Sequence, residues 1–217
     1  MMNRRDFSTA LVGATGLAGA ALSSTAQAQG GLVEGQHYLR LPSPAPTSSP
    51  GKVEVVEFFM YSCPHCNALE PQLAAWVKQL PSDVSFRRIP VAFRPNLEIH
   101  QRLYYALEAL GQLEALHAKA FAAIHVEHKM LLKDEDVAAW AGANGLDGAK
   151  LVDTMKSFGV AGKVRQVKPL MEAYKIDGVP TLGIQGRWTT SGSQTGTHEK
   201  ALQVASALIE QARKSKG

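Results

Sequence analysis

The hydrophobic residues follow two different periods along the chain, and each period predicts a set of elements. A run of β-branched and aromatic residues predicts a strand at Val53–Met60, and apolar residues at helical spacing predict a helix at Asn67–Leu80. Further strands are expected at about Val84–Phe93, Thr181–Gln185 and Trp188–Ser191. Strands combined with helices in this way indicate an α/β fold.

Helical spacing dominates the chain between the second and third of these strands. The predicted helices are Ile99–Val126, Asp134–Ala143, Asp147–Met155, Val160–Tyr174 and a closing helix near His198–Lys214. No strand pattern interrupts residues 96–158, so we expect this segment to be a helical insertion into the sheet domain. Pro71 lies inside the first long helix and is expected to kink it.

The first 28 residues have the pattern of an export signal. The run Asn3-Arg4-Arg5-Asp6-Phe7 precedes the weakly apolar stretch Ala10–Leu22, and Ala26-Gln27-Ala28 fits a small-residue cleavage site. The paired arginines are typical of a twin-arginine signal, with a general secretory signal as the alternative. We therefore expect residues 1–28 to be removed and the mature protein to be soluble in the periplasm.

Composition excludes few classes of protein. Of the 217 residues, 45% are hydrophobic and 19% are charged, which is ordinary for a globular chain. The net charge of +4 is modest, and no block of Lys and Arg interleaved with aromatic residues points to nucleic acid. No stretch after the signal is long and apolar enough to predict a membrane span.

The two cysteines are the most informative residues, because they lie together in Cys63-Pro64-His65-Cys66. A structural disulfide stabilises a protein most when it closes a long loop, and a bridge across two residues restricts the unfolded chain very little. A purely structural role is therefore disfavoured. The spacing instead predicts a pair that cycles between disulfide and dithiol.

The predicted elements place this pair at a junction between a strand and a helix. Cys63 would lie at the helix N-terminus, where free backbone N–H groups favour a thiolate, so we assign it as the attacking sulfur. Pro64 suits the first helical turn, His65 can add positive charge or a hydrogen-bond donor, and Cys66 would be the resolving partner. A stabilised thiolate favours the reduced form, which predicts net oxidase activity.

The segment Glu57-Phe-Phe-Met-Tyr-Ser-Cys-Pro-His-Cys66 resembles the active site of DsbA-type periplasmic thiol:disulfide interchange proteins. Gly178-Val179-Pro180-Thr181 resembles the cis-proline loop of the same family. The resemblance runs from about Gly35 to the C-terminal helix. It implies a thioredoxin-like domain formed by residues 29–95 and 159–217, with the helical insertion at 96–158.

The resemblance also implies roles for residues outside the cysteine pair. Val179 and Pro180 are expected to form a cis peptide bond and a binding edge for a client strand. Glu57 corresponds to a buried acid that moves protons to and from the resolving cysteine, although a surface carboxylate on an edge strand is the alternative. Arg88 matches the basic partner of that acid, and pairing with solvent is its alternative.

The expected partners follow from the redox cycle. Reduced exported proteins would be the clients, and a membrane quinone-linked oxidase resembling DsbB would regenerate the disulfide of a monomer that has no other cofactor. Two other functions remain open. The first is an isomerase or reductase of the same fold; resemblance to the isomerases would imply an added N-terminal dimerisation domain, for which Gln29–Lys52 is too short. The second is a copper-binding module, which would use both cysteines and a histidine.

A metal site is not predicted in the helical segment. The histidines considered are His117, His125 and His128, of which His125 and His128 could come together at helical spacing. No cysteine or dedicated carboxylate ligand is evident beside them.

Overall fold

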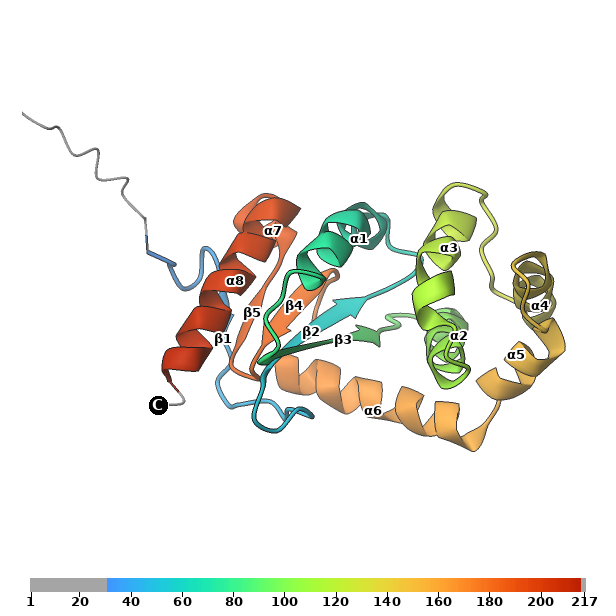
Figure 1. The fold of residues 1–217 in the computed structure, drawn as a ribbon, viewed down its shortest axis with the longest axis horizontal. Coiled ribbons are helices and arrows are strands. Elements are labelled where there is room, and N and C mark those ends of the chain that lie inside the picture. The colour runs from blue at the N-terminus through green and yellow to red at the C-terminus, as the bar shows by residue number, and fades with distance from the viewer. Residues whose placement is uncertain (1–30, 216–217) are drawn as a thin grey trace, which may run out of the picture. The chain divides into compact units, whose positions relative to one another are not determined.

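A computed structural model describes residues 31–215 of the chain, so the predicted signal at residues 1–28 lies outside the described part. The described chain contains a five-stranded mixed sheet with helices on both faces (Figure 1). Within it, no helix is long and apolar enough to cross a membrane.

The strand order places the strand that leads into the two cysteines inside the sheet rather than at its edge. In spatial order the strands are β1 (Leu39–Arg40), β5 (Trp188–Thr190), β4 (Thr181–Ile184), β2 (Val53–Phe59) and β3 (Val84–Pro90). Strand β2 is parallel to β3 and antiparallel to β4, and all seven of its residues are buried. A strand covered on both faces is expected to be mostly apolar, and β2 is so except for two buried glutamates, Glu54 and Glu57.

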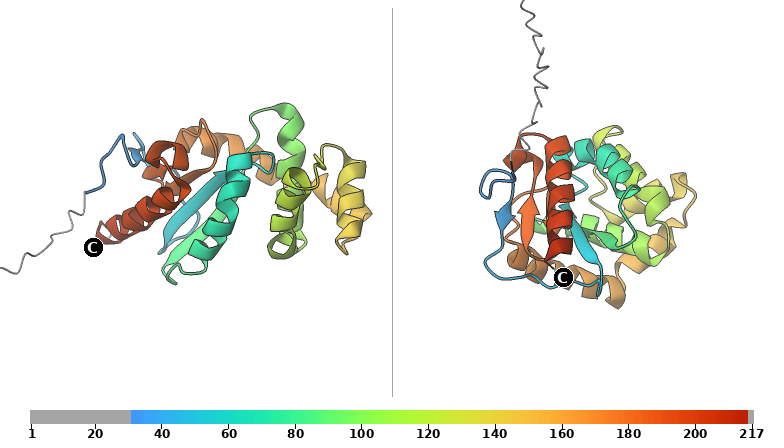
Figure 2. Two further views of the ribbon diagram at one scale, coloured as in Figure 1. Left: turned by 90° about the horizontal axis from the view of Figure 1, so that it is seen from above. Right: turned by 60° about the vertical axis from the view of Figure 1, so that its left-hand side comes forward.

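The helices cover both faces of the sheet. Their bounds are α1 (Pro64–Val77), α2 (Glu98–Ala109), α3 (Leu113–His125), α4 (Asp134–Ala143), α5 (Gly148–Met155), α6 (Phe158–Tyr174), α7 (Gly192–Thr195) and α8 (His198–Lys214). Helices α1 and α8 pack side by side on one face, where Leu73 and Leu208 join Val55 in one buried cluster (Figure 2).

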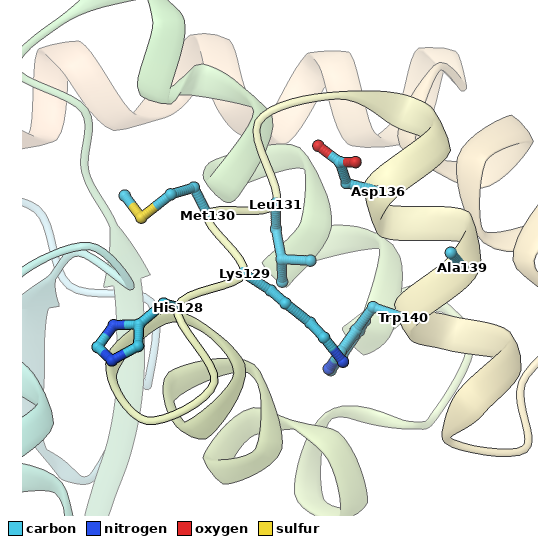
Figure 3. Close-up of a pocket in the computed structure, with 7 residues that line it drawn as sticks. All are labelled: His128, Lys129, Met130, Leu131, Asp136, Ala139 and Trp140. Carbon is cyan, nitrogen blue, oxygen red and sulfur yellow. The ribbon is translucent and has the colours of Figure 1, made fainter.

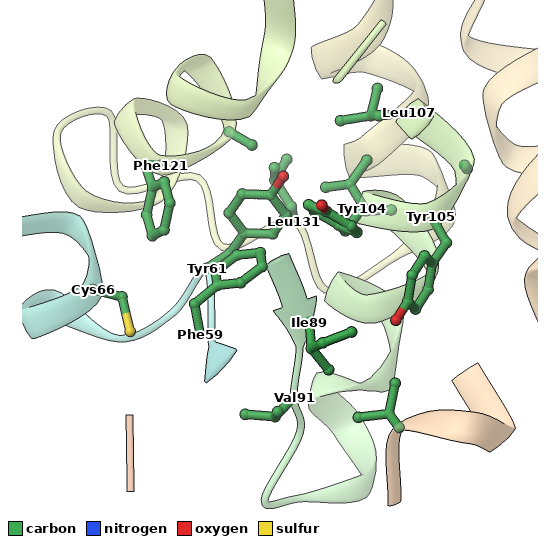
Figure 4. Close-up of a cluster of buried hydrophobic side chains, with 14 of the residues drawn as sticks. Phe59, Tyr61, Cys66, Ile89, Val91, Tyr104, Tyr105, Leu107, Phe121 and Leu131 are labelled. Atoms are coloured by element: carbon green, nitrogen blue, oxygen red, sulfur yellow. The ribbon is translucent and has the colours of Figure 1, made fainter. Parts of the chain in front are cut away.

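A second and larger cluster continues from the other face of the sheet into the inserted helices. On the sheet it includes Phe58, which packs against Tyr174 at the end of α6 with 5.1 Å between ring centroids. Toward α2 and α3 it includes Phe59, Tyr104 and Phe121, and the side chain of Cys66 belongs to the same cluster (Figure 4). The redox pair is therefore built into the hydrophobic core.

Most predicted elements are confirmed within a few residues, but the helix predicted at Ile99–Val126 is wrong as a single element. The chain forms α2 and α3 instead, separated at Gly111, whose φ of +67° is a left-handed conformation that glycine adopts without steric cost. Three short elements were not predicted: β1, α7 and a 3-10 turn at Pro95–Leu97. The strand predicted to Phe93 ends at Pro90.

Helix α1 runs without interruption through Pro71, so the kink predicted at this residue stays a prediction. Helices α2 to α5 follow β3 and precede α6, which agrees with a helical segment between two parts of the sheet. The boundaries 96–158 of the proposed insertion also stay a prediction.

We expect Gly183→Ala to destabilise the protein by about 1–3 kcal/mol, since small-to-large changes in a packed core have costs of this size. A Cβ atom at Gly183 in β4 would lie 2.3 Å from a ring carbon of buried Tyr174. Gly162→Ala in α6 is the matched control, because its Cβ would have only ordinary contacts. Urea denaturation should show a loss for Gly183→Ala alone; equal stability of both variants would contradict the packing described.

Candidate active site

The end of β2 and the start of α1 hold the two cysteines. Cys63 is the N-cap residue of α1, with φ −87° and ψ 119°, and Pro64 occupies the first turn, where no helical N–H is required. The backbone N–H of Cys63 donates to the carbonyl of Met60 at 3.1 Å. Both cysteines are free thiols, and the side chain of Cys66 is fully buried. The geometry predicted for this junction is confirmed.

The surroundings of Cys63 favour its thiolate. Its pKa is lowered to about 6, first by a hydrogen bond from the Cys66 thiol, against the opposing effect of burial. The backbone N–H groups of Cys66 and His65 and the charge of His65 lower it further. These are the unpaired N–H groups that every helix N-terminus presents. Cys63 is thus suited to be the nucleophile and leaving group of the pair.

Cys66 has the opposite electrostatic environment. Burial is the main cause that raises the pKa of its thiol, and the thiol of Cys63 and the charge of Glu57 raise it further. Glu57 is itself fully buried in β2, and burial raises its pKa to about 8 despite the nearby Arg88. A protonated carboxyl group therefore lies within electrostatic range of the sulfur that must gain or lose a proton in each redox cycle.

Arg88 joins Glu57 to a second carboxylate. The Arg88 side chain comes from β3, in register with Glu57, and its Nε donates to Glu57 Oε2 at 3.0 Å. The terminal nitrogen Nη2 of Arg88 donates to Glu70 Oε1 at 2.6 Å. The predicted pairing of Glu57 with Arg88 is confirmed. Burial excludes the surface alternative for Glu57, and Arg88, whose side chain is 17% exposed, is paired with two carboxylates instead of with solvent alone. Sequence reasoning missed Glu70, although its position four residues after Cys66 places both on one face of α1.

The loop before β4 lies against the nucleophile. The Val179–Pro180 peptide bond is cis, as predicted, and the Cys63 thiol donates to the Val179 carbonyl at 3.5 Å. Beside this loop, a pocket of about 280 Å³ is lined by Val179, Pro180, His65 and His198, together with residues of the turn between α7 and α8. The structure therefore brings the cysteine motif and the cis-proline motif, which are far apart in the sequence, into one site.

The histidines of the inserted helices lie apart from the cysteine pair or have contacts of another kind. No group of three or more metal-ligating side chains occurs within residues 31–215. The Nε2 atom of His125 instead lies 2.7 Å from the Tyr61 carbonyl, next to the active-site loop. A pocket of about 430 Å³ beside His128 is lined by residues of one loop and α4, including Trp140 (Figure 3). It contains none of the predicted site residues.

Comparison with known proteins agrees with this geometry. Residues 54–203 match the family described as DSBA-like thioredoxin domain. The thiol:disulfide interchange protein DsbA of Bordetella parapertussis is 41% identical over 208 residues, covering 95% of this chain and 97% of that protein. The DsbA of Pseudomonas aeruginosa is 39% identical over 197 residues, covering 91% and 93%. Its crystal structure matches with a TM-score of 0.81 and covers 84% of this chain and 95% of that one.

Replacement of Cys66 should raise the pKa of Cys63, because the largest stabilisation of that thiolate is the hydrogen bond from Cys66. We expect a rise of about one to two pH units in Cys66→Ala, the size of a hydrogen bond to a charged group. Cys66→Ser retains a donor and should show a smaller rise. The measurement is thiolate absorbance against pH, and equal values in wild type and Cys66→Ala would contradict this explanation.

Glu57→Gln should remove a pH dependence of stability from the reduced protein. The pKa of Glu57 is about 8 in the folded chain and about 4.5 unfolded, so the folded state holds the extra proton between these values. The stability contributed by this proton is complete below pH 4.5 and is lost, by about 1.4 kcal/mol per pH unit, as the pH rises to about 8. Urea unfolding across this range should show the stability of Glu57→Gln rising relative to that of wild type as the pH increases. Parallel plots of stability against pH for the two proteins would show that Glu57 does not hold a proton.

Proposed function

The chain belongs to the DSBA-like thioredoxin family and is a thiol:disulfide oxidoreductase, and we propose that it donates its Cys63–Cys66 disulfide to reduced exported proteins in the periplasm. The observation that supports this direction is the unequal pKa of the two sulfurs. Cys63 titrates near 6, below neutral pH, whereas the Cys66 thiol stays protonated. The dithiol is thereby stabilised, which makes the disulfide a stronger oxidant.

The exchange takes place in two steps. A client thiolate attacks Cys63 Sγ and forms a mixed disulfide, while the bond between the two cysteines breaks and the Cys66 sulfur takes a proton from Glu57. A second client thiolate then attacks the client sulfur of the mixed disulfide, and Cys63 leaves as a thiolate. The client loses two electrons and two protons. One proton restores Glu57 through the solvent, the other is released, and the cysteine pair gains both electrons.

Client binding is assigned to the cis-proline loop. The Val179 carbonyl lies 3.5 Å from Cys63 Sγ, so a client strand hydrogen-bonded to the Val179 backbone would hold its own cysteine next to the nucleophile. The pocket beside Val179, Pro180 and His65 provides space for residues that flank the client cysteine. Pro180 has no backbone N–H to donate, so the hydrogen bonds to the client must come from the neighbouring backbone groups of the loop.

The proposed cycle needs a second partner. Each turnover leaves Cys63 and Cys66 reduced, and a membrane quinone-linked oxidase of the DsbB type would accept both electrons and restore the disulfide. The proposed cycle needs only one copy of the chain and no separate cofactor, because the reacting disulfide belongs to the chain itself, and we propose that the protein acts as a monomer.

The two cysteines should behave differently toward a client. Cys66→Ala, treated with an unfolded client whose cysteine is activated as a mixed disulfide with thionitrobenzoate, should displace thionitrobenzoate and accumulate a mixed disulfide through Cys63, because the resolving sulfur is missing. Cys63→Ala should accumulate none, since Cys66 is fully buried and its thiol is held protonated. Wild type should transfer its disulfide stoichiometrically to the same client in its reduced, unmodified form. Mass spectrometry identifies the linked residue, and an adduct through Cys66, or no net transfer by wild type, would overturn the proposal.

A further inference from the structure

The side chain of His117 connects the inserted helices to the buried charges beneath the redox pair. It projects from α3 and is 5% exposed. Its Nδ1 lies 2.8 Å from the hydroxyl of Tyr61, two residues before Cys63, and its Nε2 lies 3.5 Å from Glu70 Oε2. The rings of Phe59 and Phe121 pack against it. This histidine has no part in the exchange steps proposed above, so its contacts need another explanation.

The two polar neighbours of His117 select one tautomer. The Tyr61 hydroxyl is buried and neutral, because burial raises its pKa well above its ordinary value, so it has a proton to donate to Nδ1. The proton of the neutral imidazole then lies on Nε2, facing the Glu70 carboxylate. The other tautomer would oppose the Nε2 lone pair to a carboxylate oxygen. Burial also lowers the pKa of His117, which keeps the ring neutral.

Glu70 holds its position between His117 and Arg88. One oxygen accepts from Arg88 at 2.6 Å, and the other lies 3.5 Å from His117 Nε2; neither Glu70 Oε2 nor His117 Nε2 has a hydrogen-bond partner among the described residues, so each is the nearest polar group left for the other. Arg88 also donates to Glu57, so a single arginine is shared by two buried carboxyl groups. Because the two carboxyl groups share one arginine, the one that binds Arg88 as an anion takes the stabilising charge, and the other is left to carry the proton.

We propose that His117 is a positioning residue of the redox centre: its Nε2–H, oriented by Tyr61, holds Glu70 as the anion that binds Arg88 and so keeps the buried proton on Glu57, beside Cys66. The proposal rests on the proton transfer assigned to Glu57 in the proposed function. The other groups that face this cluster are Arg88 from β3, which lowers the pKa of His117, and the neutral phenol of Tyr104 from α2, whose ring contacts the imidazole.

The test is a titration of the two carboxyl groups by ¹³C NMR of the reduced full chain, with Glu57→Gln and Glu70→Gln used to assign the signals. In wild type, Glu57 should titrate near pH 8 and Glu70 below its ordinary range. In His117→Phe, which fills the space but donates nothing, the pKa of Glu70 should rise by about one to two pH units. The pKa of Glu57 should fall, because a Glu70 carboxylate that His117 no longer positions competes less well with Glu57 for Arg88.

Two further variants separate this role from simple packing. His117→Gln retains both a donor and an acceptor, and it should return each pKa at least halfway to the wild-type value. Phe121→Leu loosens the same aromatic cluster without removing a hydrogen bond, and it should lower stability but leave both carboxyl groups unchanged. Shifts in Phe121→Leu as large as those in His117→Phe, or no shift in His117→Phe, would overturn the proposal.

The outcome of this titration is independent of disulfide transfer. Failure of the client experiment with normal carboxyl titrations would reject the proposed function and leave the placement of the proton intact. Normal disulfide transfer by a His117→Phe protein whose carboxyl groups do not shift would reject only the role of His117.

Discussion

The redox centre depends on the unequal burial of two sulfur atoms that are separated by one helical turn. Cys63 lies at the N-terminus of α1, where backbone N–H groups and the Cys66 thiol stabilise its anion. Cys66 lies one turn further into the core, where an anion has lost its solvation. A single helix start at the end of a buried strand thereby produces one reactive and one protected thiol, and the direction of electron flow follows from that difference.

The same burial requires a device for moving protons. A buried carboxyl group is stable only when it is protonated or paired. In this site Glu57 carries the proton, and Glu70 is the anion paired with Arg88. Glu57 shares Arg88 with Glu70, and Glu70 is also contacted by His117 from the inserted helices. Removal of one partner from such a cluster costs more than the pair itself contributes to stability, because a buried charge is left uncompensated. The inserted helices therefore contribute to the electrostatics of the site as well as to the core.

The sequence could predict those parts of the site that depend on local patterns. Cys63 and Cys66 share one turn of a predicted helix, whereas the pairing of Glu57 with Arg88 was implied by the family resemblance. Glu70 and His117 could not be assigned in this way. Their contact with each other arises only when α3 packs beside α1, and helical spacing within one segment does not specify where another segment docks. The break at Gly111 was missed for a related reason, since the apolar spacing continues on both sides of it.

The most direct test of the central claim is the reduction potential of the Cys63–Cys66 pair, measured at equilibrium with glutathione at neutral pH. Each pH unit by which the pKa of Cys63 lies below the ambient pH favours the dithiol by about 1.4 kcal/mol, or about 30 mV. The account predicts a potential at least as oxidising as the roughly −180 mV of protein disulfide isomerase. A value near the roughly −270 mV of thioredoxin would contradict it and indicate a reductase.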